Sequence, residues 1–366
     1  MSDLLETTLK HLRALVGFDT RNPPRAIGTD GIFDYLCANL HGFDCRKIDH
    51  GAGAVSLHSV RGKPKRLFNV HLDTVPDSPH WSTSPFELRV DGERAVGLGA
   101  CDIKGAAAAL LAAASSSDGD AAFLFTSDEE ANDARCIAAF LAERNAYETV
   151  IVAEPTRCEA VLAHRGISSV RMHFEGRAGH ASRASATSDS AVHQAARWSA
   201  RALAFAEAQG HARFGGLTGL RFNIGRIEGG IKANVIAPAA EVRFGFRPLP
   251  SMDTDALLAT LRGFADPGPA GFSETFRGPP LPAGDIADAE SKRLAARDAA
   301  DALGIPIGNA VDFWTEASLF SHAGYTTFVF GPGDIAEAHS ADEFVALAQL
   351  DDYARTVTRL IADRLA

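Results

Sequence analysis

The sequence predicts an α/β protein in which helices cover both faces of a mostly parallel sheet, with an α+β domain inserted into the chain. Strand-like apolar runs alternate with helical runs in the first part, the pattern changes near residue 166, and it returns after residue 278. A chain of 366 residues is also long for a single hydrophobic core. We therefore expect one domain made of residues 1–165 and 279–366, and an inserted domain made of residues 166–278.

The first part of the chain carries the alternation of helices and strands. Apolar residues recur at helical spacing over residues 4–16, and the prolines at 23–24 end any helix there. The pattern predicts a second helix at residues 29–40, which Thr29 or Asp30 could cap. Further along, the patterns predict strands at residues 54–59, 67–70, 121–125 and 150–153, and helices at residues 105–114 and 136–144.

The inserted part has a different pattern of half-exposed strands and two helices. Apolar and polar residues alternate over residues 167–174, which is typical of a strand with one exposed face. The patterns predict further strands at residues 217–227, 234–246 and 274–277, and helices at residues 191–208 and 255–264. Antiparallel strands with two helices form a compact α+β unit.

Composition excludes several classes of function. The formal net charge of -10 disfavours nucleic acid or an anionic membrane as the main partner, and no apolar run is long enough to span a bilayer. The first residues lack the basic and apolar segments of a secretion signal, so we expect a cytoplasmic location. The cysteines are odd in number and scattered, which predicts neither a disulfide framework nor a cysteine zinc site: Cys37, Cys45, Cys101, Cys136 and Cys158.

Potential metal ligands follow the predicted strands. In open α/β sheets, ligands bind outside the carboxyl ends of the strands, so side chains placed there should converge. His71 and Asp73 are two apart, and an extended chain points both the same way, which suits a metal ligand and an acid that orients it. The other acidic residues in such places are Asp128, Glu129 and Glu130 after one strand, Glu154 after another, and Asp102 before a predicted helix.

The combined set suits a catalytic pair of divalent ions. Imidazoles and carboxylates without a thiolate are typical of catalytic zinc, and one carboxylate can bridge two ions. The adjacent Glu129 and Glu130 can divide the work, because neighbouring side chains diverge; Glu130 would bind metal and Glu129 would be the general base. The five potential ligands are His71, Asp102, Glu130, Glu154 and His339.

Each piece also has a local alternative. Residues 128–130 could be a solvated acidic turn, and Asp102 could be the N-cap of the helix that follows it. His339 could be a surface histidine. His180 lies in a glycine-rich turn and could be structural.

The motifs together resemble a known family over nearly the whole chain. They are His71-Leu-Asp73-Thr-Val-Pro76, Gly99-Ala-Cys-Asp102-Ile-Lys-Gly105, Asp128-Glu-Glu130, Glu154-Pro-Thr156, Gly179-His180-Ala-Ser182 and Gly331-Pro-Gly333 with His339. In this order they resemble the co-catalytic zinc aminoacylases and deacylases, a family that includes acetylornithine deacetylase, succinyl-diaminopimelate desuccinylase and carboxypeptidases. The resemblance implies a zinc-peptidase-like catalytic domain and an inserted lid and dimerisation domain.

The resemblance also implies roles for individual residues. His71 and Glu154 would hold one Zn²⁺ and Glu130 and His339 the other, with Asp102 bridging them; Co²⁺ is a plausible substitute. Asp73 would orient His71, and Glu129 would activate the water. The inserted domain would form a homodimer, and His180 would reach the partner's active site to stabilise the oxyanion. The implied substrate contacts are Arg165, Asn234, Arg247, Thr315 and Glu316.

The runs Asp312-Phe-Trp-Thr-Glu316-Ala and Gly331-Pro-Gly-Asp-Ile-Ala-Glu-Ala-His339 resemble the acetylornithine branch of the family, which implies a substrate with a free α-carboxylate and an acetylated α-amine. The chain as a whole is similar to deacetylases that act on acetylcitrulline, including the runs Gly166-Ile-Ser-Ser169, Phe214-Gly-Gly-Leu-Thr-Gly-Leu-Arg221 and Val311-Asp-Phe-Trp-Thr-Glu316. The resemblance implies N-acetyl-L-citrulline as substrate, in arginine biosynthesis, with N-acetyl-L-ornithine as the alternative; residue spacing does not separate them. A dipeptidase or carboxypeptidase on the same metals is a further alternative. An alternative of another class is a non-catalytic protein that binds metal or a cationic ligand.

Overall fold

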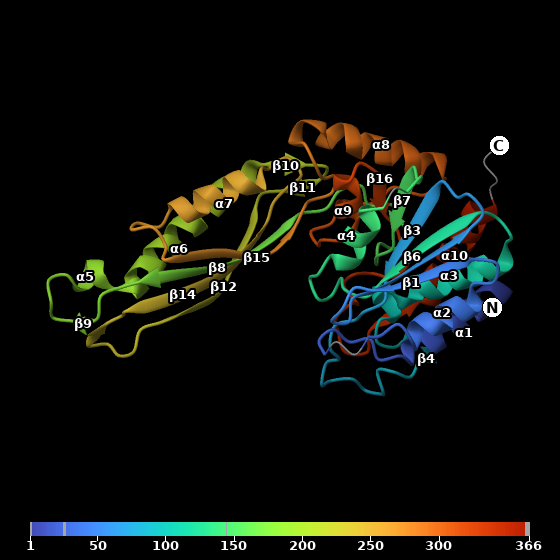
Figure 1. Cartoon of the computed structure of the whole chain (residues 1–366), viewed down its shortest axis with the longest axis horizontal. Helices are drawn as coiled ribbons and strands as arrows, with labels where there is room; N and C mark the ends of the chain where they lie inside the picture. The colour runs from blue at the N-terminus through green and yellow to red at the C-terminus, as the bar shows by residue number, and fades with distance from the viewer. Residues whose placement is uncertain (1, 25–26, 144, 363–366) are drawn as a thin grey trace. The chain divides into compact units, whose positions relative to one another are not determined.

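A computed structural model describes residues 2–24, 27–143 and 145–362 of the chain (Figure 1). Its internal contacts group the residues into two compact units. Unit 1 consists of Met1–Leu162, Ser291–Asn309 and Thr315–Ala366, and unit 2 consists of Ala163–Glu290 and Ala310–Trp314. The expected domain boundaries at residues 166 and 278 stay predictions about the catalytic and inserted domains.

Unit 1 contains a six-stranded sheet whose central strands are parallel, which confirms the predicted fold class. The strand order is β1-β2-β6-β3-β7-β16, and β3 pairs in parallel with both β6 and β7. The two strands at one edge, β1 and β2, run antiparallel to their neighbours. The strands are β1 (Asp44–Asp49), β2 (Val55–Arg61), β3 (Arg66–His71), β6 (Ala121–Thr126), β7 (Thr149–Val152) and β16 (Thr326–Val329).

Helices lie on both faces of this sheet (Figure 1). On one face, α1 and α10 pack against α3, whose residues from Gly105 to Ala114 are all buried. Because most of those residues are alanine, the neighbouring helices can approach α3 closely. The helices of unit 1 are α1 (Asp3–Val16), α2 (Ile32–Asn39), α3 (Gly105–Ser116), α4 (Arg135–Leu141), α9 (Ala317–His322) and α10 (Leu347–Ala362), together with most of α8 (Ala289–Ala302).

Three details of the helix predictions are wrong. The helix expected at residues 29–40 begins at Ile32. Neither Thr29 nor Asp30 caps it, because its N-cap is Gly31, which has no side chain that could accept a hydrogen bond. Asp102 does not cap α3, since its N-cap is Lys104. Instead Asp102 lies in a short π-helical turn, η1 (Ala100–Lys104). The helix expected to reach residue 144 ends at Leu141, and residue 144 lies outside the described part.

Unit 2 contains a four-stranded antiparallel sheet in the order β12-β14-β8-β15, with α6 and α7 on one face (Figure 1). These elements are β8 (Ile167–Glu175), β12 (Arg221–Gly229), β14 (Ala239–Arg247), β15 (Gly271–Gly278), α6 (Ala191–Ala208) and α7 (Thr254–Gly263). Each strand expected at residues 217–227 and 234–246 is interrupted, the first at Gly219, whose φ is +65°, and the second at Pro238.

Several short elements complete the fold. A three-stranded sheet in unit 1 joins β17 (Phe344–Ala346), β5 (Arg94–Val96) and β4 (Arg89–Asp91). In unit 2 the short elements are β9 (Gly179–His180), β13 (Val235–Ile236), β10 (Arg213–Phe214), β11 (Leu217–Thr218), α5 (Ala186–Asp189), η2 (Gln209–His211) and η3 (Ile286–Asp288). Within the described ranges, no helix has the length and apolar character that crossing a membrane requires.

Candidate metal centre

His71 ends β3 with its ring held in a defined orientation. Its Nδ1 lies 3.0 Å from the backbone carbonyl oxygen of Asp73, which can only accept a hydrogen bond, so Nδ1 carries the proton. In the neutral ring the lone pair of Nε2 is then available to a metal. Nε2 lies 3.1 Å from Asp102 Oδ1 and 3.9 Å from Glu154 Oε1, the latter at the end of β7.

Asp102 lies between the two histidines. Its Oδ1 faces His71, whereas its Oδ2 lies 3.2 Å from His339 Nε2. The side chain is buried within η1, whose backbone departs from helical geometry at Asp102 and Ile103. A carboxylate whose two oxygens face different imidazoles has the arrangement of a bridging metal ligand.

Glu130 and His339 complete the second half of the cluster. His339 Nε2 lies 2.9 Å from Glu130 Oε1. The side chain of His339 is 49% exposed, as the surface-histidine alternative expects. It nevertheless contacts two carboxylates of the cluster, which that alternative does not explain. Hydrogen bonds to Asp102 and Glu130 raise the pKa of His339 to about 11. In this structure the imidazole therefore holds a proton that a bound cation would replace.

The residues present fit two divalent cations. Two groups of side chains each bring three potential ligand atoms within 4.8 Å of one another: His71, Asp102 and Glu154, and Asp102, Glu130 and His339. Ligands bound to zinc at about 2.0 to 2.2 Å in a tetrahedron lie about 3.4 Å apart, close to the separations observed. Burial raises the pKa of Glu154 well above its usual range, which shows how poorly this site tolerates uncompensated negative charge.

Glu129 lies beside this cluster, and Asp128 supports the chain that carries it. Burial raises the pKa of Glu129 well above its usual range. Asp128 is fully buried and its Oδ2 accepts a hydrogen bond of 3.0 Å from the backbone N–H of Cys136, at the start of α4. The solvated acidic turn considered for residues 128–130 is therefore wrong.

Asp73 connects the two halves of the cluster. Its Oδ2 accepts hydrogen bonds of 3.0 Å from the Asn22 side-chain amide and from the backbone N–H of Glu130. Its Oδ1 is 3.5 Å from His71 Nδ1, farther than the backbone carbonyl of the same residue. Asp73 therefore contacts His71 mainly through its backbone and fixes Glu130 through its side chain.

The structure places Thr315 and Glu316 in the interior of unit 1. Glu316 is 1% exposed, and its Oε2 accepts hydrogen bonds from Asn69 Nδ2 at 2.7 Å and Thr126 Oγ1 at 3.2 Å. Burial raises the pKa of Glu316 to about 8. Thr315 Oγ1 accepts a hydrogen bond of 3.2 Å from the backbone N–H of Ala317, at the start of α9. Both predicted substrate contacts are thus bonded inside the protein.

Arg165 is also fully buried, in unit 2. Its Nε donates to the carboxylate of Asp312, and its Nη1 and Nη2 donate to the backbone carbonyls of Gly219 at 2.5 Å and Thr218 at 2.7 Å. These bonds engage all three nitrogens of the guanidinium group. Arg247 is only half-buried. The third predicted contact of unit 2, Asn234, is exposed.

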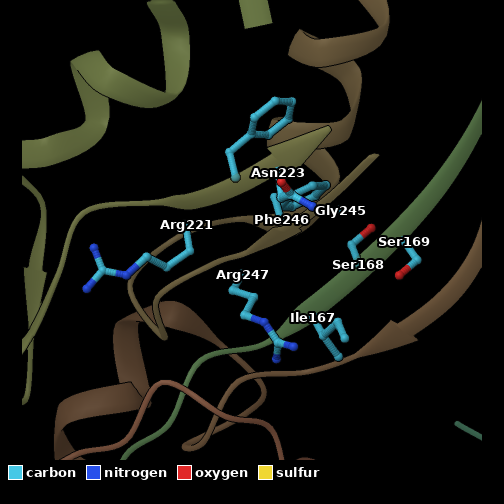
Figure 2. A pocket seen from close by; sticks show the side chains of 9 residues that line it. Ile167, Ser168, Ser169, Arg221, Asn223, Gly245, Phe246 and Arg247 are labelled. Carbon is cyan, nitrogen blue, oxygen red and sulfur yellow. The ribbon is translucent and has the colours of Figure 1, made fainter. Parts of the chain in front are cut away.

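Arg247 lines a pocket of unit 2 with a volume of about 270 Å³ (Figure 2). Its walls are polar side chains and apolar groups from neighbouring strands: Ile167, Ser168, Ser169, Arg221, Phe222, Asn223, Gly245, Phe246 and Arg247. Such a pocket, with a guanidinium group at its wall, can hold a small anionic group.

His180, in β9, is exposed and presents a defined hydrogen-bond donor. The backbone N–H of Ser182 donates to His180 Nδ1 at 3.2 Å, and Ser182 Oγ is 2.7 Å from the same nitrogen. Because Nδ1 accepts, the proton of the neutral ring is on Nε2. His180 can therefore donate from Nε2 to a ligand.

Asn22 and Glu343 contact the cluster but lie outside the motifs that predict it. Asn22 binds Asp73, as described above, and Glu343 is buried against the segment that carries Asp102. The sequence offers only one signal for Glu343, namely its place four residues after His339. For Asn22 the sequence shows only that it directly precedes the two prolines at 23–24.

A scan against protein-family models matches residues 67–363 to peptidase family M20/M25/M40. The chain is 71% identical over 362 residues to the N-acetyl-L-citrulline deacetylase of Xanthomonas campestris pv. campestris, with 99% of each chain covered. It is 28% identical over 305 residues to the acetylornithine deacetylase of Edwardsiella ictaluri, covering 80% of this chain and 78% of that protein. Its fold is similar to that of aminopeptidase PepT from Bacillus cereus, with a TM-score of 0.72, 20% identity and 98% of each chain covered.

Proposed function

The chain belongs to peptidase family M20/M25/M40, and from this premise we propose that it hydrolyses the acetamide bond of N-acetyl-L-citrulline. The products are acetate and citrulline, in a step of arginine biosynthesis. The identity of 71% over 99% of both chains is the observation that carries the choice of substrate. The chain is a metal-dependent amide hydrolase.

The structural support for the metal centre is the orientation of Asp102, with one carboxylate oxygen toward each histidine. In our proposal, His71 and Glu154 hold one ion, Glu130 and His339 hold the other, and Asp102 contacts both. Zinc fits this donor set of imidazoles and carboxylates, and Co²⁺ can replace it. When bound, such ions polarise the acetyl carbonyl and make water acidic enough to supply a nucleophile near neutral pH.

Glu129 moves the proton in the proposed reaction. Its carboxylate takes a proton from the attacking water and later delivers it to the nitrogen of the leaving amine, so that no proton is gained or lost overall. A base with a raised pKa holds that proton well enough to transfer it near neutral pH, and burial raises the pKa of Glu129.

We propose that Arg247 binds the α-carboxylate of the substrate. Arg247 lines the pocket of unit 2 and is half-buried, whereas all three guanidinium nitrogens of Arg165 already bind Asp312 or backbone carbonyls. Arg165 then acts by holding the chain around Arg247, because Nη1 of Arg165 lies 3.5 Å from the backbone carbonyl oxygen of Arg247. Thr315 and Glu316 support the site from the interior, and Asn234 is an exposed candidate contact.

We also propose a homodimer in which His180 of one subunit serves the active site of its partner. The exposed ring, with its proton on Nε2, is suited to donate a hydrogen bond to the developing oxyanion. A dimer through unit 2 and a cytoplasmic location complete the proposal; the five cysteines are unpaired thiols, which fits a reducing compartment.

Acetylornithine is the second candidate substrate, because the relative at 28% identity is an acetylornithine deacetylase. The two substrates differ at the end of the side chain, where acetylornithine carries an ammonium group and acetylcitrulline a neutral ureido group. Dipeptide hydrolysis uses the same chemistry on another amide, and a non-catalytic binding protein would need no Glu129.

A paired assay tests the proposal. The metal-free protein is reconstituted with Zn²⁺ or Co²⁺ and offered acetylcitrulline, acetylornithine and a series of dipeptides at matched concentrations. We expect the highest kcat/KM on acetylcitrulline, and loss of turnover after exhaustive chelation. A preference for acetylornithine or for a dipeptide would overturn the substrate, and full activity without metal would overturn the mechanism.

A further inference from the structure

The buried carboxylate of Glu343 holds the backbone of the segment that carries Asp102. Its Oε2 accepts a hydrogen bond of 3.0 Å from the N–H of Gly99, and its Oε1 accepts bonds of 2.9 Å from the N–H groups of Cys101 and Asp102. Glu343 is only 2% exposed. Three backbone donors converging on one carboxylate form a rigid, charge-assisted anchor.

The segment around Asp102 relies on this anchor because its own backbone does not form a regular helix. Asp102 has φ -122° and ψ 85°, and Ile103 has φ -147° and ψ 26°, both outside the helical region. The N–H groups of Cys101 and Asp102 therefore bind a side chain that comes from far along the sequence. The position of the Asp102 carboxylate therefore depends on how firmly the backbone of residues 99–102 is held.

Lys104 supplies a positive charge to this arrangement. It is fully buried, its Nζ donates a hydrogen bond of 2.9 Å to the carbonyl oxygen of Phe18, and its charge interacts favourably with that of Glu343. A buried carboxylate without such compensation would be costly. The charge of Lys104 therefore lowers the cost of burying the Glu343 carboxylate beside residues 99–102.

We propose that Glu343 is a positioning residue of the metal centre, which fixes the Asp102 carboxylate between the two ion sites. Because Glu343 is four residues after His339, it also ties the His339 segment to the Asp102 segment. The proposal rests on the proposed function only in taking Asp102 as the ligand that both ions share. Residues that orient ligands in this way affect metal affinity by about 10- to 100-fold.

The Glu343→Gln substitution tests this role. The glutamine keeps the size of the side chain, but its amide NH₂ would face backbone N–H donors and one acceptor atom is lost. We expect the Kd for Zn²⁺, from calorimetric titration of the metal-free protein, to rise about tenfold or more at both sites. The absorption spectrum of the Co²⁺ form should change, and kcat at saturating zinc should fall while KM stays within about twofold.

The Glu337→Gln substitution is the matched control. It removes the same charge from the same segment, and the Glu337 carboxylate has no hydrogen-bond partner among the residues that the structure describes. We expect wild-type zinc affinity and Co²⁺ spectrum for this variant. An equal loss in both variants would overturn the positioning role, because charge alone would then explain it.

A second variant decides the matter if E343Q does not fold. Glu343→Asp keeps the charge but is one methylene shorter, so it cannot reach all three N–H groups, and we expect an intermediate loss of zinc affinity. Wild-type zinc affinity and Co²⁺ spectrum in the folded variant would overturn the proposal. Zinc titration uses no substrate, so failure of wild-type turnover on acetylcitrulline would count against the proposed function and leave this test intact.

Discussion

At the scale of single residues, Glu129 carries the proposed proton transfer without contributing to the metal ligands. In the Glu129→Gln variant the amide cannot accept the proton of water, so we expect kcat to fall at least about 100-fold. Zinc content should stay at the wild-type value, because the proposed ligands are other residues. Steady-state kinetics and metal analysis of the same sample measure both. Glu148→Gln, an exposed glutamate paired with Lys65, is the control that should keep full activity. Near-normal turnover of E129Q would remove Glu129 from the mechanism.

Glu316 should make the stability of the metal-free protein depend on pH. Burial, followed by repulsion from Asp128, raises its pKa to about 8 in the folded protein, whereas the unfolded pKa is about 4.3. Between these values the folded state holds a proton that the unfolded state has lost, so the free energy of unfolding falls as pH rises. The slope is at most about 1.4 kcal/mol per pH unit. Glu316→Gln mimics the protonated form and lacks this slope.

We therefore expect the free energy of unfolding of E316Q, relative to that of the wild type, to increase by about 1 to 3 kcal/mol as the pH rises from about 5 to about 8. Unfolding of both metal-free proteins, followed by circular dichroism across this range, measures the difference. A difference in stability that is constant with pH would show that Glu316 is ionised in the folded protein.

The sequence marks some functional residues and not others for a physical reason. His71 and Glu154 follow strands that apolar runs predict, so their place at one sheet edge is foreseeable. Glu343 acts through the backbone groups that it meets, and these come from residues 99–102. An arginine such as Arg165 is typical of an anion-binding site. Only the tertiary structure shows that its guanidinium nitrogens bind Asp312 and backbone carbonyls instead.

At the scale of elements, Trp198 joins α6 and α7 to the sheet of unit 2. It is fully buried on α6, its ring centroid is 4.7 Å from that of Phe244 in β14, and its Nε1 donates a hydrogen bond of 2.7 Å to the carbonyl oxygen of Leu261 in α7. Removing the ring in Trp198→Ala leaves a cavity and an unpaired carbonyl, so we expect a loss of about 3 to 5 kcal/mol in the stability of unit 2.

Hydrogen exchange measures this effect one element at a time. In W198A the amides of β8 and β14 should exchange faster, while those of β3 and β6 in unit 1 keep their protection. Leu203→Ala, on the same helix but 46% exposed, is the control and should change stability by less than about 0.5 kcal/mol. Unchanged protection of β8 in W198A would contradict the role of the tryptophan.

Periodicity predicts long elements well and short ones poorly. The helix α6 and the strand β8 each bury alternate or helically spaced residues, and both were predicted to within a residue. The three strands β4, β5 and β17 have three residues each, too few to show a period. Such strands form because their neighbours offer hydrogen bonds.

At the scale of the whole molecule, the proposed dimer makes each active site depend on two chains. A heterodimer of one Glu129→Gln subunit and one His180→Ala subunit distinguishes this from a self-sufficient subunit, and two affinity tags allow its purification. If His180 serves the partner, one site of the heterodimer has both residues replaced and the other has both intact. We then expect about half of the wild-type activity per dimer, although both parent homodimers are strongly impaired.

If His180 instead serves its own subunit, each site of the heterodimer keeps one defect, and the activity stays as low as the mean of the two homodimers. The two results differ by far more than the error of an assay, because each parent defect removes a group that acts in the transition state. The exposed position of His180 permits either arrangement. Failure to capture any heterodimer with the two tags, in a preparation where both chains fold, would exclude the dimer itself.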